Sequence, residues 1–427
     1  MNRASGAGLS LCQTLFYQGG KTMFRPVAQI PLDYSVFKDK NSVFAWAPSG
    51  AILFGNGCVA RTGQELKRLG VSRVVVVSDQ GLVKAGIVQK VLDALEQAGV
   101  TYQLYDQCEA DPSVETVEAI AALAKDADLL VGVGGGSSID PAKAAAILVT
   151  NGGSIRDYQG CDKFSKAPLP LVAIPTAAGT GTETTPFAVI TDRQRAWKMP
   201  IGGTGIMPAL VIADPELTYS LPPHITAATG MDALTHAIEA YTSRCTEPIS
   251  DALAIQAIKL LAKAIRPAVF RGDIDRDARY DMMMGSMLAG YAFTSASLGI
   301  SHCMAHPLGA MYHVPHGVGN AICLPVVMEF NMGAWPERYA DIAPFFGEDV
   351  SGLSVLDGAR KGVECVYRLV EDLPIQPLEH WGVTLQSLDQ LADEAMKGGD
   401  RPNNARMTTK EDFIRLYTKA LTLKKQG

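Results

Sequence analysis

Residues 127–153 read ADLLVGVGGGSSIDPAKAAAILVTNGG, and their pattern is a strand, a glycine turn and a helix. The apolar run before the turn is typical of a buried strand, and we expect the helix to begin at residues 140–143. Glycines let the backbone approach a phosphate closely, and the free N–H groups at a helix start favour an anion. The spacing is neither GxGxxG nor the P-loop GK[ST], so a standard Rossmann fingerprint or an ATPase is not indicated. We therefore predict that the turn binds the pyrophosphate of a nucleotide.

Strands and helices alternate on both sides of this unit, from residue 43 to about residue 222. The run RVVVV at 73–77 is rich in β-branched residues, which is typical of a strand buried on both faces of a parallel sheet. Such alternation predicts an α/β sheet with helices on both faces. Further expected elements are a hairpin formed by VFAWAP and AILFGNG, helices over 57–70, 82–99 and 114–127, and strands over 101–106, 170–176, 187–192 and 209–217.

The pattern changes near residue 222, beyond which nearly every segment has helical periodicity and strand signals vanish. We therefore predict an α/β nucleotide-binding domain over residues 43–222 and an all-helical domain over residues 223–427. Residues 1–42 are interpreted as an extension of uncertain order, because no acidic residue occurs before Asp33 and no secretion signal is evident. A targeting segment or an interface arm remains the alternative for this extension.

The composition restricts the class of protein. The 427-residue chain has 47% hydrophobic residues, 19% charged residues and a net charge of −6, which is ordinary for a soluble globular enzyme. No basic stripe indicates nucleic acid and no long apolar run indicates a membrane span, so neither is expected as a partner. The eight cysteines are scattered without a CxxC pair, which favours reduced thiols and a cytoplasmic location.

Histidines are concentrated in one segment. The chain has seven, and four of them fall within SHCMAHPLGAMYHVPHG at 301–317. In GMDALTHAIEAY, Asp232 and His236 lie four residues apart, so both side chains project from one face of a helix. His302 and His306 share this spacing, and the Pro-His-Gly turn expected after them can add a ligand from outside that helix. A carboxylate with several imidazoles suits iron(II) or zinc better than calcium or magnesium, so we predict a metal site.

Two further features suit a nucleotide. Asp79 ends the strand RVVVV, where a carboxylate can accept a hydrogen bond from a ribose 2′-OH and repel a 2′-phosphate. This interpretation favours NAD over NADP, and the alternative is that Asp79 caps the following helix. The threonine-rich loop after the strand at 170–176 can bond the nucleotide or cap its own turns. A cation beside a nicotinamide would favour hydride transfer from an alcohol, and a neighbouring imidazole would carry the proton.

Four segments together resemble the signatures of the iron-containing (group III) alcohol dehydrogenases: GGGSSIDPAK, IPTAAGTGTE, GMDALTHAIEAY and GISHCMAHPLGAMYHVPHGVGNAI. The resemblance covers about residues 43–427. It implies a Rossmann-like, dehydroquinate-synthase-like domain followed by a helical metal-binding domain, with the active-site cleft between them. The implied reaction transfers hydride between a small primary alcohol or diol and NAD, in a homo-oligomer of two or more chains. Fe²⁺ is the implied metal, although the same ligands accept zinc, manganese or cobalt.

The resemblance also implies roles for single residues. The implied metal ligands are Asp232, His236, His302 and His316, and the implied proton relay beside the nicotinamide is His306. The implied cofactor contacts are Asp79, Gly135, Gly136, Ser137, Thr176, Thr185 and Lys198. Phe187 and Phe293 fall where family members line the substrate pocket. His313 matches no ligand position and is interpreted as a surface residue or a neighbour of the ligands.

Other functions of this fold stay open. Hydroxyacid–oxoacid transhydrogenases are close relatives that keep the nicotinamide bound, and glycerol dehydrogenases share the fold, although HCMAHPLG and His316 point away from the latter. A non-catalytic metal- or nucleotide-binding protein is the alternative from another class. The segment at 401–406 departs from the family's Asn-Pro-Arg pattern. Arg401 or Arg406 could bind an anionic substrate or be a solvated surface arginine, so the substrate is not transferable from the family.

Overall fold

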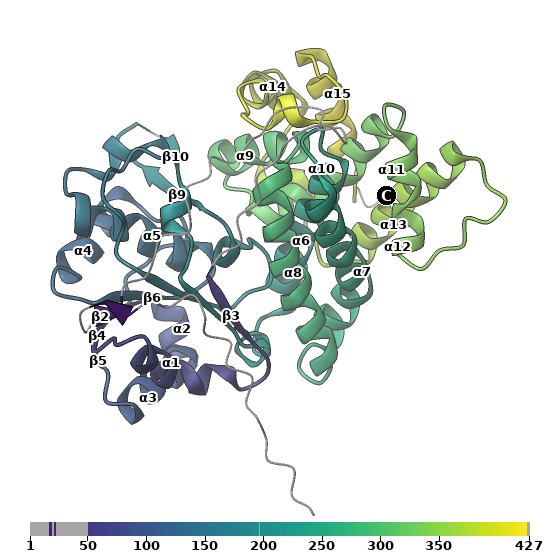
Figure 1. Ribbon diagram of the computed structural model, residues 1–427. Helices are drawn as coiled ribbons and strands as arrows, with labels where there is room; N and C mark the ends of the chain where they lie inside the picture. Colours follow the sequence, from purple (N-terminus) through teal and green to yellow (C-terminus); the bar gives the residue numbers. More distant parts are fainter. Residues whose placement is uncertain (1–16, 19–20, 23–49, 196, 425–427) are drawn as a thin grey trace, which may run out of the picture.

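The computed structural model describes residues 17–18, 21–22, 50–195 and 197–424. Of the extension predicted over residues 1–42, these ranges include only the short strands β1 (Tyr17–Gln18) and β2 (Lys21–Thr22), which pair antiparallel. VFAWAP, the first half of the predicted hairpin, lies outside the described residues. The described chain forms an α/β part and a helical part, which lie side by side in Figure 1.

A six-stranded sheet forms the centre of the α/β part. The strand order is β3–β11–β8–β6–β4–β5, and every pair is parallel, so the predicted parallel α/β sheet is confirmed. The strands are β3 (Ala51–Phe54), β4 (Arg73–Val77), β5 (Thr101–Tyr105), β6 (Leu129–Gly134), β8 (Leu171–Pro175) and β11 (Leu210–Ala213). The segment AILFGNG, predicted as half of a hairpin, thus supplies the edge strand β3 of this sheet.

Helices cover both faces of the sheet because successive side chains of a strand point to opposite sides. In β4, Val75 packs into the apolar core of one face, whereas the adjacent Val76 packs into the core of the other face. The first core includes residues of α4 (Val114–Leu123) and α5 (Gly136–Asn151); the second includes residues of α1 (Thr62–Arg68) and α3 (Ile87–Gln97). This arrangement explains the apolar run RVVVV, since no position in the strand after Arg73 faces solvent.

Two helices of the α/β part differ from the predicted ones. The segment predicted as one helix over 82–99 forms two, α2 (Gln80–Lys84) and α3, because Gly86 adopts a left-handed conformation with φ of 73° and caps α3. Helix α5 begins at Gly136 instead of residues 140–143, and Pro141 lies inside the helix. The glycine turn and the start of the helix therefore coincide.

A three-stranded sheet lies beside the main one, in the order β7–β10–β9 (Figure 1). Its strands are β7 (Gly160–Cys161), β9 (Phe187–Asp192) and β10 (Trp197–Gly202). No strand was predicted over residues 197–202, which contain Pro200. Pro200 is nevertheless aligned with Val189 of β9, and its side chain is exposed while the neighbouring Met199 and Ile201 are buried.

The second part of the described chain is helical, as predicted. Its longer helices are α6 (Pro223–Thr242), α7 (Pro248–Arg271), α8 (Arg276–Ala296), α9 (Ile300–Tyr312), α10 (His316–Asn331), α13 (Val355–Asp372), α14 (Leu388–Met396) and α15 (Lys410–Ala420), with the short α11 (Pro336–Ala340) and α12 (Ile342–Phe345) between them. The boundary at residue 222 stays a prediction; β11 ends at Ala213 and α6 begins at Pro223. Among the described residues, no helix is both long and apolar enough to cross a membrane.

The two parts meet where the threonine-rich loop after β8 packs against α8. A Cβ added to Gly290 would lie 2.1 Å from Thr184 Oγ1, and one added to Gly181 would lie 2.8 Å from Gly290 Cα. Glycine at both positions therefore allows the backbones to approach this closely. The contact brings the loop that follows β8 up to the helical part, which contains the histidine-rich segment.

Candidate active site

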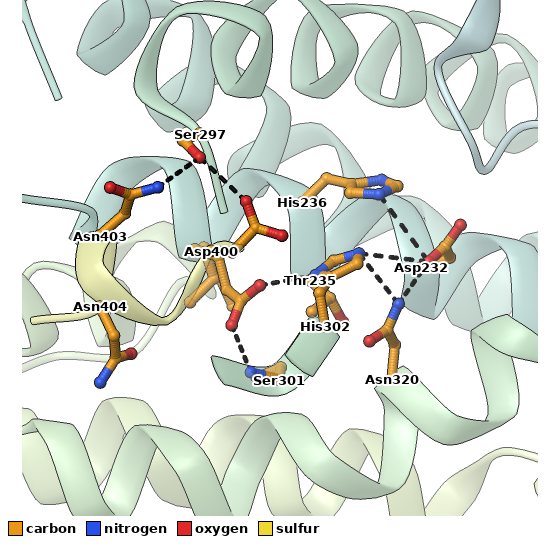
Figure 2. A network of polar contacts seen from close by, with 12 residues as sticks. Asp232, Thr235, His236, Ser297, Ser301, His302, Asn320, Asp400, Asn403 and Asn404 are labelled. Atoms are coloured by element: carbon orange, nitrogen blue, oxygen red, sulfur yellow. Dashed lines mark hydrogen bonds and ion pairs between the residues drawn. The ribbon is translucent and has the colours of Figure 1, made fainter. Parts of the chain in front are cut away.

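Three helices of the helical part bring one carboxylate and three imidazoles together. Asp232 and His236 come from α6, His302 from α9 and His316 from the start of α10. One potential ligand atom from each residue lies within 4.8 Å of the others. Figure 2 shows the side chains of His236, His302 and Asn320 directed at Asp232. Asp232 and His236, four residues apart on α6, are both buried, and their ligand atoms lie close together as the spacing predicted.

The distances in this cluster fit a metal ion. Asp232 Oδ1 lies 3.5 Å from His316 Nε2, 3.9 Å from His302 Nε2 and 4.0 Å from His236 Nε2. Two donor atoms that each lie about 2.1 Å from one cation are at most about 4.2 Å apart, so all three separations are compatible with a shared ion. One carboxylate with three imidazoles is also a donor set that iron(II) and zinc accept.

The electrostatics of the cluster favour its metal-binding protonation state. Burial opposes ionisation of Asp232, but the imidazoles of His236, His316 and His302 and the amide of Asn320 outweigh it and lower the pKa of Asp232. Burial also lowers the pKa of His302, and it lowers the pKa of His316 to about 4. At neutral pH the cluster therefore offers a carboxylate and, at His302 and His316, neutral imidazoles, which are the forms that bind metal.

The other two histidines of the segment have different surroundings. The ring of His306 is stacked near that of His316, with 5.3 Å between their centroids, and its side chain keeps access to solvent. Desolvation, and then the neighbouring His316, lower the pKa of His306 to about 4, so it is a neutral base at pH 7. His313 is exposed and ends α9 in a left-handed conformation with φ of 55°. The structure thus places His313 away from the cluster.

One local prediction in this segment is wrong. The sequence suggested that His316 lies in a turn, but it is the first residue of α10. Pro315 precedes it as the N-cap residue, with φ of −55° and ψ of 135°, and its ring fixes φ near this value. The inference that His316 enters from outside the helix of His302 is nevertheless correct, because α9 ends at Tyr312.

Two residues contact the cluster that the sequence interpretation missed. The Nδ2 group of Asn320 donates to Asp232 Oδ1 at 2.7 Å, and Glu239 Oε2 lies 2.6 Å from His302 Nδ1. Both residues are buried. A signal was present, because Asn320 lies four residues after His316 and Glu239 three residues after His236, which places each on the face of a ligand.

The glycine turn lies at the junction of β6 and α5. Gly134 has φ of 149°, and a Cβ there would lie 2.6 Å from Ser138 Oγ, so the turn requires glycine. At Gly135 an added Cβ would meet no described atom within 4 Å, so space for a ligand lies beside the backbone. Gly136 and Ser137 open α5, whose first N–H groups have no helical carbonyl to bond. These features suit a phosphate group.

Two of the predicted cofactor residues, Asp79 and Thr176, follow β4 and β8, which lie on either side of β6, and Thr185 lies in the loop between β8 and β9. Asp79 follows β4 and caps α2 by accepting a hydrogen bond from Leu82 N at 3.0 Å, so the capping role is real. Thr176 follows β8, and its N–H donates to the carbonyl of Gly134 at 3.1 Å. The carboxyl ends of parallel strands are where open α/β sheets bind ligands.

A buried lysine fixes the loop that contains Thr185. Lys143 Nζ donates to the carbonyls of Thr182 at 2.5 Å, Thr185 at 2.9 Å and Phe187 at 2.8 Å. Burial lowers the pKa of Lys143 to about 8. Lys143 belongs to α5, so the glycine turn and the threonine-rich loop are held in one arrangement.

Lys198 and the two phenylalanines lie on different elements. Lys198 lies on β10, and its Nζ forms an ion pair with Asp111 Oδ1 at 2.7 Å. Its charge also contributes to lowering the pKa of His306 and of His316. Phe293 stacks on the ring of His236, with 4.5 Å between centroids. Phe187 opens β9, aligned with Gly202 of β10, and so lies in the α/β part.

The arginines of the divergent segment make local contacts. Arg401 Nη1 donates to the carbonyl of Thr408 at 3.2 Å. Arg406 Nη1 donates to the carbonyl of Phe330 at 3.2 Å, and its guanidinium lies 4.1 Å from the centre of the Phe330 ring. Arg401 thus binds the segment before α15 and Arg406 binds the end of α10, and neither contact supports binding of an anionic substrate.

Comparison with known proteins agrees with this site. Residues 49–215 match the family model described as iron-containing alcohol dehydrogenase, and residues 226–421 match the C-terminal model of the Fe-containing alcohol dehydrogenase family. The choline dehydrogenase of Bacillus subtilis (strain 168) is 41% identical over 379 residues, which cover 87% of this chain and 94% of that protein. A crystal structure of 1,3-propanediol oxidoreductase has 38% identity and a TM-score of 0.87, over 89% of this chain and 100% of that one.

A further solved structure includes the cofactor. Sulfoacetaldehyde reductase from Bifidobacterium kashiwanohense, in complex with NAD⁺, has 30% identity and a TM-score of 0.82, over 90% of this chain and 100% of that chain. The fold and the two groups of site residues thus define an oxidoreductase that uses NAD and a metal ion. The chain belongs to the iron-containing alcohol dehydrogenase family.

Proposed function

We propose that this chain interconverts small primary alcohols or diols and their aldehydes, with NAD as hydride carrier and a divalent cation held by Asp232, His236, His302 and His316. The observation that carries the proposal is the convergence of these four side chains, with ligand atoms within 4.8 Å of one another, in a chain of this family. Iron(II) is the cation that the family suggests, and zinc or manganese suit the same donors.

Separate groups of residues bind the cation and the nucleotide. When bound, the cation would supply Lewis acidity for the negative charge on the substrate oxygen, and the nicotinamide would supply the hydride-accepting group. Gly135, Gly136 and Ser137 bind the pyrophosphate at the start of α5, as the open space beside Gly135 supports. Thr176, Thr185 and Lys198 contact other parts of the nucleotide. Asp79 accepts a hydrogen bond from the adenosine ribose with the oxygen that does not cap α2.

His306 carries the proton. Its neutral imidazole is close to His316 and keeps access to solvent, so it can accept a proton from the substrate hydroxyl and release it to water. Phe293 lines the substrate pocket on the side of His236, on which it stacks, and Phe187 lines it from the start of β9. Aromatic rings at these two positions of the pocket would favour a short carbon chain over a highly polar substrate.

The relatives support a small substrate without fixing its identity. Their names include choline, 1,3-propanediol and sulfoacetaldehyde, which are all short molecules. An additional methylene in a pocket changes discrimination by only about 1–3 kcal/mol, so related enzymes readily differ in substrate. The proposed substrates are therefore short primary alcohols and diols. The proposed active form is a homo-oligomer of two or more chains in the cytoplasm. The seven cysteines that the structure describes are free thiols, which supports that compartment.

The test is a screen of NADH oxidation with short aldehydes, ketoacids and sulfonated aldehydes, with metal content measured on the same sample. We expect turnover with short aldehydes, in proportion to bound metal, and loss of turnover after metal removal. Activity that survives complete removal of the metal would refute the proposed role of the cation. A nucleotide that stays bound through purification and does not exchange would instead favour a hydroxyacid–oxoacid transhydrogenase.

A further inference from the structure

Glu239 lies directly behind the metal cluster and joins two of its helices. It is a residue of α6, three positions after His236, and only 5% of its surface is exposed. Its Oε1 accepts a hydrogen bond from the backbone N–H of Ser301 at 2.7 Å, and its Oε2 lies 2.6 Å from His302 Nδ1. One buried carboxylate thus fixes both the start of α9 and the ring of His302.

The contact selects the tautomer of His302. Because the carboxylate of Glu239 accepts a hydrogen bond, the proton of the imidazole lies on Nδ1, and the lone pair of Nε2 is directed to the cluster, 3.9 Å from Asp232 Oδ1. A bond to a charged acceptor is also stronger and more directional than a neutral one. It therefore holds the ring in the orientation that metal binding requires.

His236 provides a contrast within the same cluster. Its Nδ1 is buried and has no hydrogen-bond partner among the described residues. The ring is instead sandwiched between Phe293, at 4.5 Å between centroids, and His302, at 4.7 Å. Stacking thus orients His236, and it depends on the position of His302. Loss of the contact to Glu239 would disturb both rings.

Charge adds a second effect. Asp232 is the only carboxylate among the four clustered side chains, so a divalent cation would leave one uncompensated positive charge in a buried site. An ionised Glu239 would bring a second negative charge within one imidazole of the cluster. Compensation at this short distance is worth more in a protein interior than in water.

We propose that Glu239 is a positioning residue that orients His302 and balances the charge of the bound cation, and so sets the affinity for metal. The proposal deepens the proposed function and rests on it for the location of the cation. Some carboxylates accept a hydrogen bond from the second ring nitrogen of a ligating imidazole, and their loss typically lowers metal affinity by about 10–100-fold. Glu239 is such a carboxylate for His302.

The space behind Glu239 determines which substitution is informative. A small cavity with room for about one water molecule is lined by polar groups, including Glu239, Ser301, Thr242, Asn331 and Asn404. A truncated side chain would allow water to reach His302 Nδ1 and replace part of the contact. Glu239→Gln is better, because it keeps the shape and a hydrogen-bond acceptor while it removes the charge.

Glu247→Gln is the matched control. Glu247 is also buried, with 3% of its surface exposed, and also accepts backbone hydrogen bonds, from Ile249 N and Ser250 N, both at 2.7 Å. These bonds cap α7 and involve no residue of the cluster. The control therefore reproduces the loss of a buried carboxylate without the contact to a ligand.

The experiment compares Zn²⁺ affinity of the metal-stripped full chain and its variants by competition with a chromogenic chelator. We expect Glu239→Gln to weaken binding by about 10–100-fold and Glu247→Gln to leave it within about twofold. The visible spectrum of the Co²⁺-loaded protein should also change with Glu239→Gln, because the ligand geometry relaxes. Unchanged affinity and an unchanged spectrum would overturn the proposal.

Loss of folding and failure of the proposed function are distinguishable from this result. Thermal unfolding without metal shows whether each variant folds. If Glu239→Gln does not fold, Glu239→Asp keeps the charge but shortens the side chain, and we expect a smaller but measurable loss of affinity; wild-type affinity in that variant would overturn the proposal. A wild-type chain that binds no divalent cation would refute the metal site itself.

Discussion

Asn320 donates its side-chain amide to Asp232, with 2.7 Å between Nδ2 and Oδ1, and this bond connects α10 to α6 across the metal cluster. The same Nδ2 lies 3.1 Å from His302 Nε2 and 3.2 Å from His316 Nε2. One amide thus contacts three of the four proposed ligands. It holds the carboxylate of Asp232 in place through a group that carries no charge.

Replacing this amide by a carboxylate should make the stability of the fold depend more strongly on bound metal. In Asn320→Asp two carboxylates would lie within hydrogen-bond distance, and their repulsion should destabilise the metal-free protein by about 1–3 kcal/mol. A divalent cation should compensate both charges, so Zn²⁺ should raise the melting temperature more in the variant than in the wild type. Thermal unfolding with and without Zn²⁺ measures this difference.

Asn331→Asp is the control for this substitution. Asn331 lies on the same helix, is buried, and exchanges two hydrogen bonds with Asn404. Its replacement should destabilise the protein to the same extent with and without Zn²⁺. Equal stabilisation by Zn²⁺ in Asn320→Asp and in the wild type would contradict the interpretation of Asn320.

Metal binding and proton transfer should separate in two histidine variants. His302→Ala removes a proposed ligand, so bound metal and turnover should be lost together. His306→Gln removes the proposed proton relay and leaves the four clustered side chains, so metal should be retained while kcat falls by about 10²–10⁴-fold. Metal content and kcat measured on the same preparations test both statements. Loss of metal from His306→Gln would show that His306 is a ligand instead.

Lys143 should affect cofactor binding without contact to the cofactor. In Lys143→Met the carbonyls of Thr182, Thr185 and Phe187 lose their common donor, which should cost about 1–3 kcal/mol of folding free energy. The loosened loop should raise the dissociation constant for NADH by about tenfold, which corresponds to about 1.4 kcal/mol. Fluorescence titration with NADH measures the change, and Lys67→Met on the exposed surface of α1 is the control. Wild-type NADH affinity in Lys143→Met would show that the loop does not contact the nucleotide.

The preference for NAD can be tested apart from the capping role of Asp79. Asparagine is as good a helix cap as aspartate, so Asp79→Asn should keep the bond to Leu82 N and the stability of α2. It removes the charge that would repel a 2′-phosphate, and kcat/KM with NADPH relative to NADH should rise by about tenfold or more. An unchanged ratio would leave Asp79 with the capping role alone.

The sequence identified the elements whose pattern is local. The valines of β4, the glycines of the turn at 134–136 and the paired residues Asp232 and His236 each reflect one strand or one helix, and the structure has them where the pattern indicated. The break at Gly86 was not predicted, since the apolar positions of α2 and α3 continue one helical pattern across it.

The site residues that the sequence did not predict depend on contacts between different elements. Glu239 becomes informative only when α9 is known to pass behind α6, and Asn320 only when α10 is known to approach Asp232. Lys143 resembles an ordinary surface lysine of an amphipathic helix until the loop after β8 is placed over it. The spacing of residues within one helix does not indicate which other elements pack against that helix. The family resemblance supplied the ligand set for the same reason, because it summarises tertiary contacts.

The buried carboxyl of Glu183 should make stability fall as pH rises. Glu183 lies in the threonine-rich loop with 3% of its surface exposed, and burial raises its pKa from 4.5 to about 7. Between these two values the unfolded chain releases the proton while the folded protein retains it. The stability contributed by the neutral carboxyl is therefore complete below about pH 4.5 and is lost as pH rises through about 7.

Glu183→Gln removes this dependence and keeps the shape of the side chain. The free energy of unfolding of the wild type should decrease relative to the variant between pH 5 and pH 8, by at most about 1.4 kcal/mol per pH unit and by roughly 3 kcal/mol in total. Urea unfolding of both proteins at several pH values measures the difference. Parallel curves would show that the carboxyl is ionised in the folded protein throughout this range.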